Sequence, residues 1–555
     1  NIDDHTRIYI RAEFSPVPEY QASSDESNIS LSFGNSHNVS IRYGISFINE
    51  EQAHRNMELE VSGKDCSGLS AEGRDEWNRE LSKIEVYGGT EEEKSVFYTS
   101  LYRTFERMIN INEYGKYYSP YDRAVHDTER NIYTDDWIWD TYRAAHPLRA
   151  IIDRKSEEDM INSFIRMTME SEEKWMPTFP EITGDSHRMN GNHAVAVILD
   201  GYRKGLRGFD VDSAYMFCRN ALLHKSLLPW TRQPLTDLDM FYHDSLYFPA
   251  LNPGESETCP FVDPSERRQA VAVTLGHSYD SWCLSELASE TGHKEDIDLF
   301  RRYASAYKNL FNNGTGFFHP KNSDGKFIEP FDYRFSGGMG ARDYYDENNG
   351  WTYRWNCQHD IPGLINLMGG EEKFAEDLDA TFREPLGLSK YEFYSKLPDQ
   401  TGNVGQFSMA NEPSLHIPYL YDDCGQPWKT QKRIRTLLSQ WFRNDLMGVP
   451  GDEDGGGMSA FVVFSMMGFY PVTPGIPEYA IGSPVFERIV IHLENGKTFE
   501  VIAKNNSAEN IYIRSAALDG RKLERPFISH EEIMSGGTMV LEMDNRPNMS
   551  WGSEK

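Results

Sequence analysis

The sequence has no long hydrophobic run and no excess of positive charge. No stretch reaches the ~18 consecutive apolar residues that a membrane helix needs, so we expect no membrane span. The formal net charge is −30. Proteins that bind the phosphate backbone present a basic face, so nucleic acid is not expected as a partner. An acidic surface by itself indicates little more than solubility.

Cysteines are few and scattered. The six cysteines include no C-x-x-C pair, which excludes zinc-knuckle and thioredoxin-type sites. Isolated thiols of this kind are usually small buried hydrophobic residues. The sequence starts at Asn1 without the basic and apolar segments of a secretory leader. We therefore expect a processed chain or a fragment.

The first part of the sequence reads as β structure. Residues 8–14 and 40–47 alternate apolar and polar side chains, the period of a half-buried strand. The stretch 23–38 between them is rich in Ser, Asp and Asn and is predicted to be a loop. From about Asp75 the period becomes helical.

Apolar residues then recur at the spacing of amphipathic helices. Clear examples are Met160, Ile161, Phe164 and Ile165; Ile297, Phe300, Ala304 and Tyr307; and Ile434, Leu437, Leu438, Trp441 and Phe442. Helices continue to about Gly468, where a glycine followed by a proline ends the last one. So many helices in roughly 370 residues indicate a closed ring of helix pairs rather than a four-helix bundle.

Alternation with period two returns after the helices. Residues 488–494 and 497–503 flank Asn495-Gly496, a strong hairpin signal. The layout is thus β, then a large helical block, then a small β region.

Residues 452–459 read Asp-Glu-Asp-Gly-Gly-Gly-Met-Ser. In an extended loop, residues two apart project to the same side, so Asp452 and Asp454 would share one side and Glu453 the other. Two carboxylates aimed at one point bind a hard cation or deprotonate a water molecule. Capping of the following helix is the alternative. An EF-hand is excluded because its twelfth position would be Val463.

Three further segments combine charged and aromatic residues. Asn411 and Glu412 precede a proline that holds the backbone extended, which suits gripping sugar hydroxyls or a cation; a surface turn is the alternative. Glu347 adjoins clustered rings, and a partly dry pocket favours the protonated carboxyl of a general acid. Asp140 and Arg143 lie between aromatic residues, where they form either a sugar site or a helix-surface ion pair.

Six stretches, in this order along nearly the whole chain, resemble glycoside hydrolase family 92, a family of α-mannosidases. They are Trp-Asp-Thr-Tyr-Arg at 139–143 with His146-Pro-Leu; Met-Asn-Gly-Asn-His at 189–193; Glu-Asn-Asn-Gly-Trp at 347–351 with Tyr353 and Trp355; His359-Asp360; Asn411-Glu-Pro with Pro-Tyr-Leu-Tyr at 418–421; and Gly-Asp-Glu-Asp at 451–454 with Met-Ser-Ala at 458–460 and Gly-Phe-Tyr-Pro at 468–471.

The resemblance implies a multidomain α and β fold. The expected parts are an N-terminal β-sandwich portion (1–75), a helical linker (76–110), an (α/α)6 toroid catalytic domain (111–470) and a C-terminal β region (471–555). It implies an exo-acting, Ca²⁺-dependent α-mannosidase that works by single displacement with inversion. The expected substrates are mannose-containing oligosaccharides or glycoprotein glycans, of the N-glycan or mannan type. The expected place is outside the cell, in the periplasm or at the cell surface.

The resemblance also implies roles for individual residues. Glu347 is the expected general acid and Asp454 the general base, assisted by Asp452. The expected substrate-binding residues are Trp139, Asp140, Arg143, Trp351, His359, Asp360 and Glu412, and the expected metal-binding residues are Asn411, Glu412, Asp452 and Asp454. In an inverting enzyme the two catalytic carboxyl groups lie ~6.5–9.5 Å apart, which leaves room for the attacking water.

The sequence departs from the family pattern in three places. The acid segment has Asn-Asn-Gly where the family usually has Gly-Asn-Ala. Residues 274–282 lack the glutamate usual after Leu275 and have Ser281 where a second aspartate is common. The β part before the helices, about 75 residues, is shorter than the family's sandwich, so we expect a truncated or rearranged sandwich.

Three other functions remain open. A mannosyl-phosphodiester hydrolase of the same family tolerates loss of the acid, because phosphate leaves readily; the presence of Glu347 favours an ordinary sugar leaving group. A non-catalytic glycan-binding protein fits an incomplete sandwich. A phosphorylase on a helical toroid is a third alternative. Linkage preference and oligomeric state do not follow from the sequence.

Overall fold

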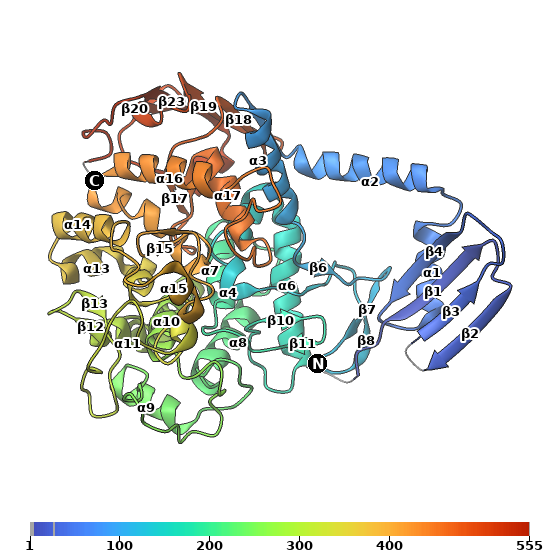
Figure 1. Cartoon of the computed structure of the whole chain (residues 1–555), viewed down its shortest axis with the longest axis horizontal. Coiled ribbons are helices and arrows are strands. Elements are labelled where there is room, and N and C mark those ends of the chain that lie inside the picture. The colour runs from blue at the N-terminus through green and yellow to red at the C-terminus, as the bar shows by residue number, and fades with distance from the viewer. Residues whose placement is uncertain (1–4, 26–27, 554–555) are drawn as a thin grey trace. The chain divides into compact units, whose positions relative to one another are not determined.

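A computed structural model describes residues 5–25 and 28–553 (Figure 1). The chain forms two compact units. Unit 1 holds the residues up to Glu80 together with Asn110–Tyr133 and Ile182–Gly184, and unit 2 holds Leu81–Ile109, Thr134–Glu181 and the rest from Asp185 onward. The mixed α and β class is confirmed.

Unit 1 contains small antiparallel sheets, helix α1 (Glu50–Glu60) and nearly all of helix α2 (Cys66–Leu81). Strand β1 (Tyr9–Ser15) pairs with β4 (Ser40–Ser46), and α1 (Glu50–Glu60) packs on this pair. Gly44 permits the close approach, because a Cβ there would lie 2.4 Å from the backbone oxygen of Ala53. The opposite face is apolar and exposed at Ile41, Tyr43 and Ile45, the composition of the inner face of a β-sandwich.

Two predictions for this region are wrong. The stretch 23–38, predicted as a loop, includes the end of β2 (Tyr20–Asp25) and all of β3 (Asn28–Ser32), which pair antiparallel, because backbone pairing overrides the low strand propensity of Ser and Asn. Helices also begin earlier than about Asp75, with α1 and with α2 (Cys66–Leu81). Helix α2 has no buried residue, so it lacks the apolar stripe by which a helix is found in a sequence.

Unit 2 contains the helical block. Helix α10 (Ala270–Thr291) is 22 residues long and buried along most of its length, and α17 (Gly457–Met467) is buried at every position. The sequence of α17 is apolar on nearly all sides, as expected for a helix in the middle of a core, whereas α10 also buries polar residues such as His277 and Asp280. The helices are α3 (Glu91–Arg103), α4 (Ile138–Thr141), α5 (Ala145–Ile152), α6 (Arg154–Glu170), α7 (Ala194–Arg203), α8 (Val211–His224), α9 (Asp237–Ser245), α10 (Ala270–Thr291), α11 (Lys294–Ala304), α12 (Gly350–Tyr353), α13 (Ile361–Met368), α14 (Glu371–Thr381), α15 (Lys390–Lys396), α16 (Pro427–Trp441), α17 (Gly457–Met467) and α18 (His530–Met534).

The predicted helical stripes are confirmed in α6, α11 and α16, since Phe164, Phe300 and Leu437 are buried. Helix α17 ends at Gly468, whose φ of 96° closes it as predicted. Of the described residues, none lies in a helix long and apolar enough to cross a membrane.

The C-terminal β region forms two sheets (Figure 1). Six strands lie in the order β21-β20-β23-β19-β18-β5, and three in the order β16-β17-β22. The predicted hairpin at Asn495-Gly496 is confirmed as β18 paired with β19. Strand β5 precedes the helical block in sequence and completes the larger sheet. The strands are β5 (Ile84–Tyr87), β16 (Phe469–Tyr470), β17 (Glu478–Ile481), β18 (Arg488–His492), β19 (Thr498–Lys504), β20 (Tyr512–Leu518), β21 (Arg521–Leu523), β22 (Phe527–Ser529) and β23 (Gly537–Asp544).

Candidate active site

Three carboxylates from distant parts of unit 2 meet at one point. Asp140, Glu412 and Asp454 each place a carboxylate oxygen within 4.8 Å of the other two. Asp140 comes from α4, Glu412 from the 3₁₀ turn Glu412–Ser414, and Asp454 from the loop before α17. The tertiary structure thus brings together three of the segments that were selected from the sequence.

Burial makes this cluster electrostatically unfavourable on its own. Glu412 is fully buried, and within the described part of the chain neither of its Oε atoms accepts a hydrogen bond. Burial, then the charges of Asp454 and Asp140, raise the pKa of Glu412 well above its usual value. Burial and the charges of Asp454 and Glu347 do the same for the pKa of Asp140. A bound cation would remove this repulsion, and carboxylate oxygens are ligands that Ca²⁺ prefers.

The loop before α17 gives neighbouring carboxylates different roles. Glu453 accepts hydrogen bonds from the backbone N of Gly456 (2.9 Å) and of Ser459 (3.2 Å), so it satisfies free amides at the start of α17. Asp454 has a φ of 53°, in the left-handed region, and reaches the cluster instead. A Cβ at Gly457 would lie 3.2 Å from that of Asp140, so glycine lets the loop approach α4 closely.

Glu347 lies beside this cluster in a loop before α12. Its φ is 59° and its side chain is 18% exposed. Oε2 accepts a hydrogen bond from Nδ2 of Asn411 (2.8 Å), whose Oδ1 in turn accepts one from Asn348 (2.5 Å). Burial, then the charge of Asp399, raise the pKa of Glu347 to about 7, against the opposing effects of Asn411 and Arg342. A carboxyl with this pKa can be protonated near neutral pH, as a general acid requires.

Asp454 also has a raised pKa. Burial raises it to about 6, the neighbouring carboxyl group of Glu412 opposes this rise, and the charges of Asp452 and Glu453 add to it. Asp452 itself is exposed and does not belong to the group formed by Asp140, Glu412 and Asp454. The structure thus places Asp452 at the rim, where it acts on Asp454 through its charge. Its predicted role as a metal ligand stays a prediction.

Trp139 and Arg143 lie with Asp140 on or just after α4. The Arg143 guanidinium is 5.3 Å from the Trp139 ring and 4.8 Å from the Tyr142 ring, and its Nε donates to the backbone oxygen of Trp139 (3.3 Å). Both side chains are buried. The i, i+3 surface ion pair considered for Asp140 and Arg143 does not fit this burial.

The hydrogen bonds of His359 and Asp360 and the ring contact of Trp351 join these residues to groups outside the carboxylate cluster. Oδ1 of Asp360 accepts from Gly363 N (2.9 Å) at the start of α13, and Oδ2 accepts from Tyr307 (2.6 Å). His359 contacts the backbone oxygen of Ala304 (3.0 Å) through Nε2. Trp351 packs edge-on against Phe317 at 5.0 Å. These contacts support helices, and the predicted binding roles of all three residues stay predictions.

Arg342 and Asp399 are site residues that the sequence interpretation missed. Nη2 of Arg342 is 3.6 Å from Glu347 and 3.8 Å from Asp399, and its Nε is 2.9 Å from Glu266. Burial raises the pKa of Asp399, Arg342 opposes the rise, and Asp452 adds to it. Arg342 lies five residues before Glu347 in the same non-periodic stretch. This closeness to Glu347 is the feature of the sequence that could have identified Arg342 as a site residue. Nothing in the sequence around Asp399 distinguishes it from a surface loop.

A buried network supports the loops around the site. His146 places Nε2 2.9 Å from Asp136 and Nδ1 2.9 Å from Glu157. Burial lowers the pKa of His146, but the two carboxylates outweigh it and raise the pKa to about 9. Asn190 donates to Asp346 (2.8 Å), directly before Glu347. His146 and Asn190, which belong to the stretches that resemble the family, thus hold the loops of the site in place rather than take part in it directly.

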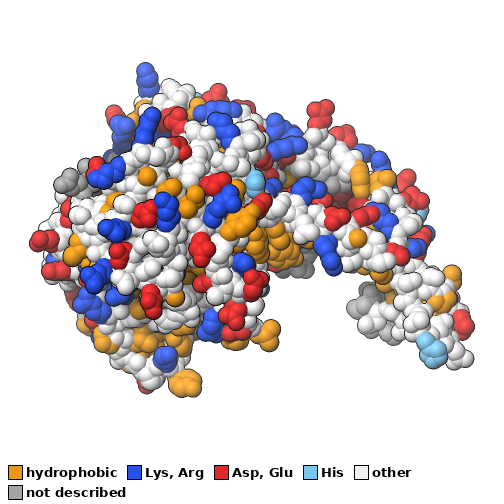
Figure 2. Space-filling model, turned by 90° about the horizontal axis from the view of Figure 1, so that it is seen from above, with side chains coloured by type: hydrophobic (Ala, Val, Ile, Leu, Met, Phe, Trp, Pro, Cys, Tyr) orange, Lys and Arg blue, Asp and Glu red, His pale blue; other side chains and the backbone are white. Residues whose placement is uncertain are grey.

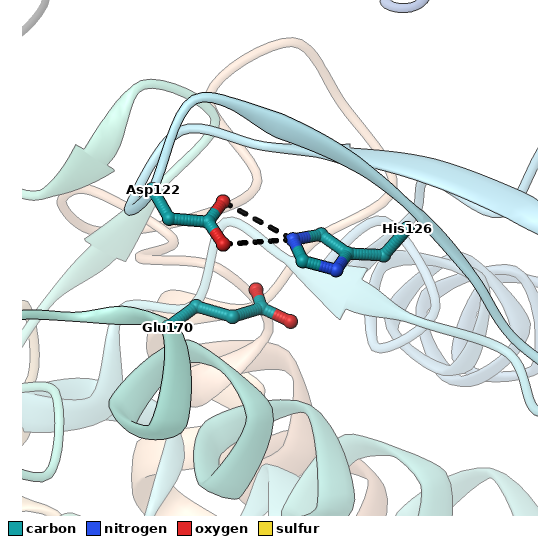
Figure 3. Close-up of side chains that lie close together, drawn as sticks. All are labelled: Asp122, His126 and Glu170. Atoms are coloured by element: carbon teal, nitrogen blue, oxygen red, sulfur yellow. Dashed lines mark hydrogen bonds and ion pairs between the residues drawn. The ribbon is translucent and has the colours of Figure 1, made fainter.

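A second acidic and histidine pair lies in unit 1. Asp122 contacts His126 Nε2 through both carboxylate oxygens, at 3.1 and 2.9 Å (Figure 3). Asp122 lies in the turn between β7 (Lys116–Ser119) and β8 (Ala124–Asp127), and His126 lies in β8, so their contact stabilises this hairpin. Glu170, also drawn there, ends α6 and belongs to unit 2.

The surface carries charges of both signs. On the face in Figure 2, acidic and basic side chains are interspersed and form no large basic patch.

The fold and the site define a class of protein: a mixed α and β protein whose loops bring carboxyl groups of raised pKa together at a buried polar centre, as in hydrolases that use acid and base catalysis. Residues 52–545 match the model of the glycosyl hydrolase family 92 catalytic domain. The chain belongs to this family, which confirms the resemblance seen in the sequence.

Two solved structures from Bacteroides thetaiotaomicron are similar to the chain. An inverting mannosidase of the family is 33% identical with a TM-score of 0.85, and the match covers 100% of this chain and 75% of that one. An α-mannosidase in complex with mannoimidazole is 26% identical with a TM-score of 0.85, covering 99% and 72%.

A curated relative is an uncharacterised secreted glycosidase of Arthroderma benhamiae. It is 27% identical over 546 residues, which cover 93% of this chain and 62% of that protein. The chain thus spans less than two thirds of the length of this relative.

Proposed function

We propose that the chain hydrolyses terminal α-linked mannose from glycans, as an exo-acting enzyme that depends on Ca²⁺ and inverts the anomeric configuration. One observation carries this proposal: two carboxyl groups of raised pKa, Glu347 at about 7 and Asp454 at about 6, occur at the same site as the buried Asp140 and Glu412. The two B. thetaiotaomicron mannosidases support the choice of mannose.

In this mechanism Glu347 donates its proton to the glycosidic oxygen as the bond to the leaving group breaks. Asp454 removes a proton from the water that attacks the opposite face of the sugar. Asn411 holds Oε2 of Glu347 in place through its 2.8 Å hydrogen bond. The charge of Asp452 raises the pKa of Asp454 and makes it a better base.

Asp140, Glu412 and Asp454 are the residues that would hold Ca²⁺. Their donor set is three carboxylates, and the oxygens of Glu412 receive no hydrogen bond from any described residue. When bound, the ion supplies positive charge that orients sugar hydroxyls. The buried Trp139 and Arg143 offer an aromatic face and a guanidinium donor to the terminal sugar.

We further propose that the helices of unit 2 form the (α/α)6 toroid of the family and that the protein acts outside the cell or at its surface. The curated secreted relative supports this location. N-glycans and mannans are the proposed natural substrates.

A mannosyl phosphodiester is less favoured as the substrate. The rim beside Glu347 carries Asp399 and the exposed Asp452, and these carboxylates repel a phosphate group. Such a substrate also needs little protonation of its leaving group, whereas Glu347 has the raised pKa of an acid.

The test uses α-1,2-, α-1,3-, α-1,4- and α-1,6-linked mannobioses, each with Ca²⁺ and with a chelator. We expect release of β-mannose, observed by proton NMR at early times, from at least one linkage and only with Ca²⁺. Binding without release by the wild type would instead identify a glycan-binding protein, and dependence on inorganic phosphate would identify a phosphorylase.

A further inference from the structure

Trp230 is an aromatic side chain held at the surface by strained backbone. The residue is 38% exposed and its φ is 59°, a conformation that bulky residues rarely adopt. Its backbone N donates to the backbone oxygen of His187 (2.8 Å), and His187 itself has a φ of 53°. Strain of this kind is concentrated at ligand-binding positions.

Trp230 is the outer end of a line of stacked groups, which we call the aromatic track. The guanidinium of Arg188 lies 5.0 Å from the Trp230 ring and 6.0 Å from the Phe179 ring. Phe179 lies 5.8 Å from Trp137, with 31° between the rings, and the guanidinium of Arg107 lies 5.1 Å from the Trp137 ring. The track consists of these five residues, all in unit 2.

The inner end of the track adjoins the carboxylate cluster. Gly455 directly follows Asp454, and a Cβ on it would lie 3.4 Å from Cβ of Trp137 and 3.5 Å from Cγ of Arg107. Trp137 also precedes Ile138, the first residue of the helix that carries Asp140. The inner end of the track therefore packs against the loop residue that follows Asp454.

The chemistry of the track fits an uncharged polyhydroxylated chain. Phe179 is buried and forms its floor, whereas the side chains of Arg188 and Arg107 are 41% and 32% exposed. Both guanidinium groups are near carboxylates: Arg188 lies 3.3 Å from Glu181, and Arg107 pairs with Asp135. Aromatic faces stack on sugar rings, and paired guanidinium and carboxylate groups donate to and accept from hydroxyls.

We propose that the aromatic track binds the sugar units of the glycan beyond the terminal one, with Trp230 as the outer stacking surface. This inference rests on the proposed function, because it assigns the terminal sugar to the carboxylate cluster. If the track binds these units, long glycans bind better than mannobiose does. The exposed side chain of Trp230 is then the main cause of that preference.

The test compares kcat/KM for mannobiose and for a linear manno-oligosaccharide of at least four units with the same linkage. Trp230→Ala should lower kcat/KM for the long substrate about tenfold, as expected for an exposed aromatic contact, and leave mannobiose within about twofold. Trp230→Phe should retain most of the preference. Tyr391→Ala is the control, since Tyr391 is 90% exposed on α15 and should change neither value.

Binding separates this inference from the proposed function. In the Glu347→Gln background, calorimetry should give a weaker Kd for the long oligosaccharide when Trp230→Ala is added, even if the wild type proves to have no hydrolase activity. Equal effects on short and long ligands, or no effect on either, would overturn the proposal. Should Trp230→Ala fail to fold, Arg188→Gln gives the same comparison, with the same expected and contrary results.

Discussion

Asn411 donates a hydrogen bond to the candidate acid Glu347 over 2.8 Å. The next residue along the chain, Glu412, belongs to the buried carboxylate cluster. A single short segment therefore orients the proton donor and contributes to the proposed calcium site. Because Pro413 follows at once and restricts the backbone of Glu412, the two side chains are held in a fixed relation to one another.

The acid and base assignments predict the effect of two isosteric variants. Glu347→Gln cannot donate the carboxyl proton and Asp454→Asn cannot accept one, so each should lower kcat by about 10²–10⁴. Steady-state kinetics on the preferred mannobiose measures this loss. Glu295→Gln on the exposed face of α11 is the control and should leave kcat unchanged. Wild-type turnover in Glu347→Gln would exclude Glu347 as the acid.

The charges around Glu347 predict opposite shifts of the alkaline limb of the pH profile. Activity should fall as pH rises through about 7, the pKa of Glu347, because the acid then loses its proton. Asp399 raises this pKa and Arg342 lowers it. Asp399→Asn should therefore move the limb to lower pH, and Arg342→Gln should move it to higher pH.

The profile of kcat/KM against pH measures both shifts at saturating Ca²⁺. Asp298→Asn, an exposed position on α11, should leave the limb in place. Shifts of both variants in the same direction would mean that loop distortion, rather than charge, is responsible.

The carboxylate cluster predicts a stabilising calcium site. A ligand present at 100 times its Kd stabilises the folded state by ~2.7 kcal/mol, so Ca²⁺ should raise the Tm of the wild type. Glu412→Gln should abolish most of this rise. Glu453→Gln, which weakens the start of α17 but leaves the cluster intact, should lower the starting Tm and keep the rise. A calcium-dependent rise retained in Glu412→Gln would exclude the site.

The buried His146 predicts a dependence of stability on pH. Its pKa of about 9 in the folded protein lies above the usual 6.5. Its ion pairs with Asp136 and Glu157 therefore stabilise the fold fully below ~6.5 and lose this contribution as pH rises through about 9. His146→Gln leaves buried carboxylates without their cation and should cost about 3–5 kcal/mol near pH 6.

Urea unfolding at several pH values measures this loss. The difference between His146→Gln and the wild type should shrink as pH approaches 9. His492→Gln breaks a half-exposed contact of 3.0 Å to Glu85 and should change the free energy of unfolding by less than ~1 kcal/mol. A pH-independent difference for His146→Gln would mean that lost packing, rather than charge, causes it.

Local patterns sufficed for much of the architecture. The strands around Asn495-Gly496, the glycine end of α17 and the apolar stripes of α6, α11 and α16 follow from periodicity and turn chemistry alone. Helix α2 and the hairpin of β2 and β3 did not follow, because α2 has no buried face and the hairpin has few strand formers.

The sequence by itself determined which carboxylates to consider, because Glu347, Glu412 and Asp454 stand in non-periodic stretches among glycines, prolines and rings. Only the tertiary structure decided what each of them does. It turned Glu453 toward a helix end and Asp454 toward Asp140, and it set Arg342 between Glu347 and Asp399. The reason is physical: a carboxyl group acquires its pKa from burial and from neighbouring charges, and folding brings those neighbours from segments that are far apart in the chain.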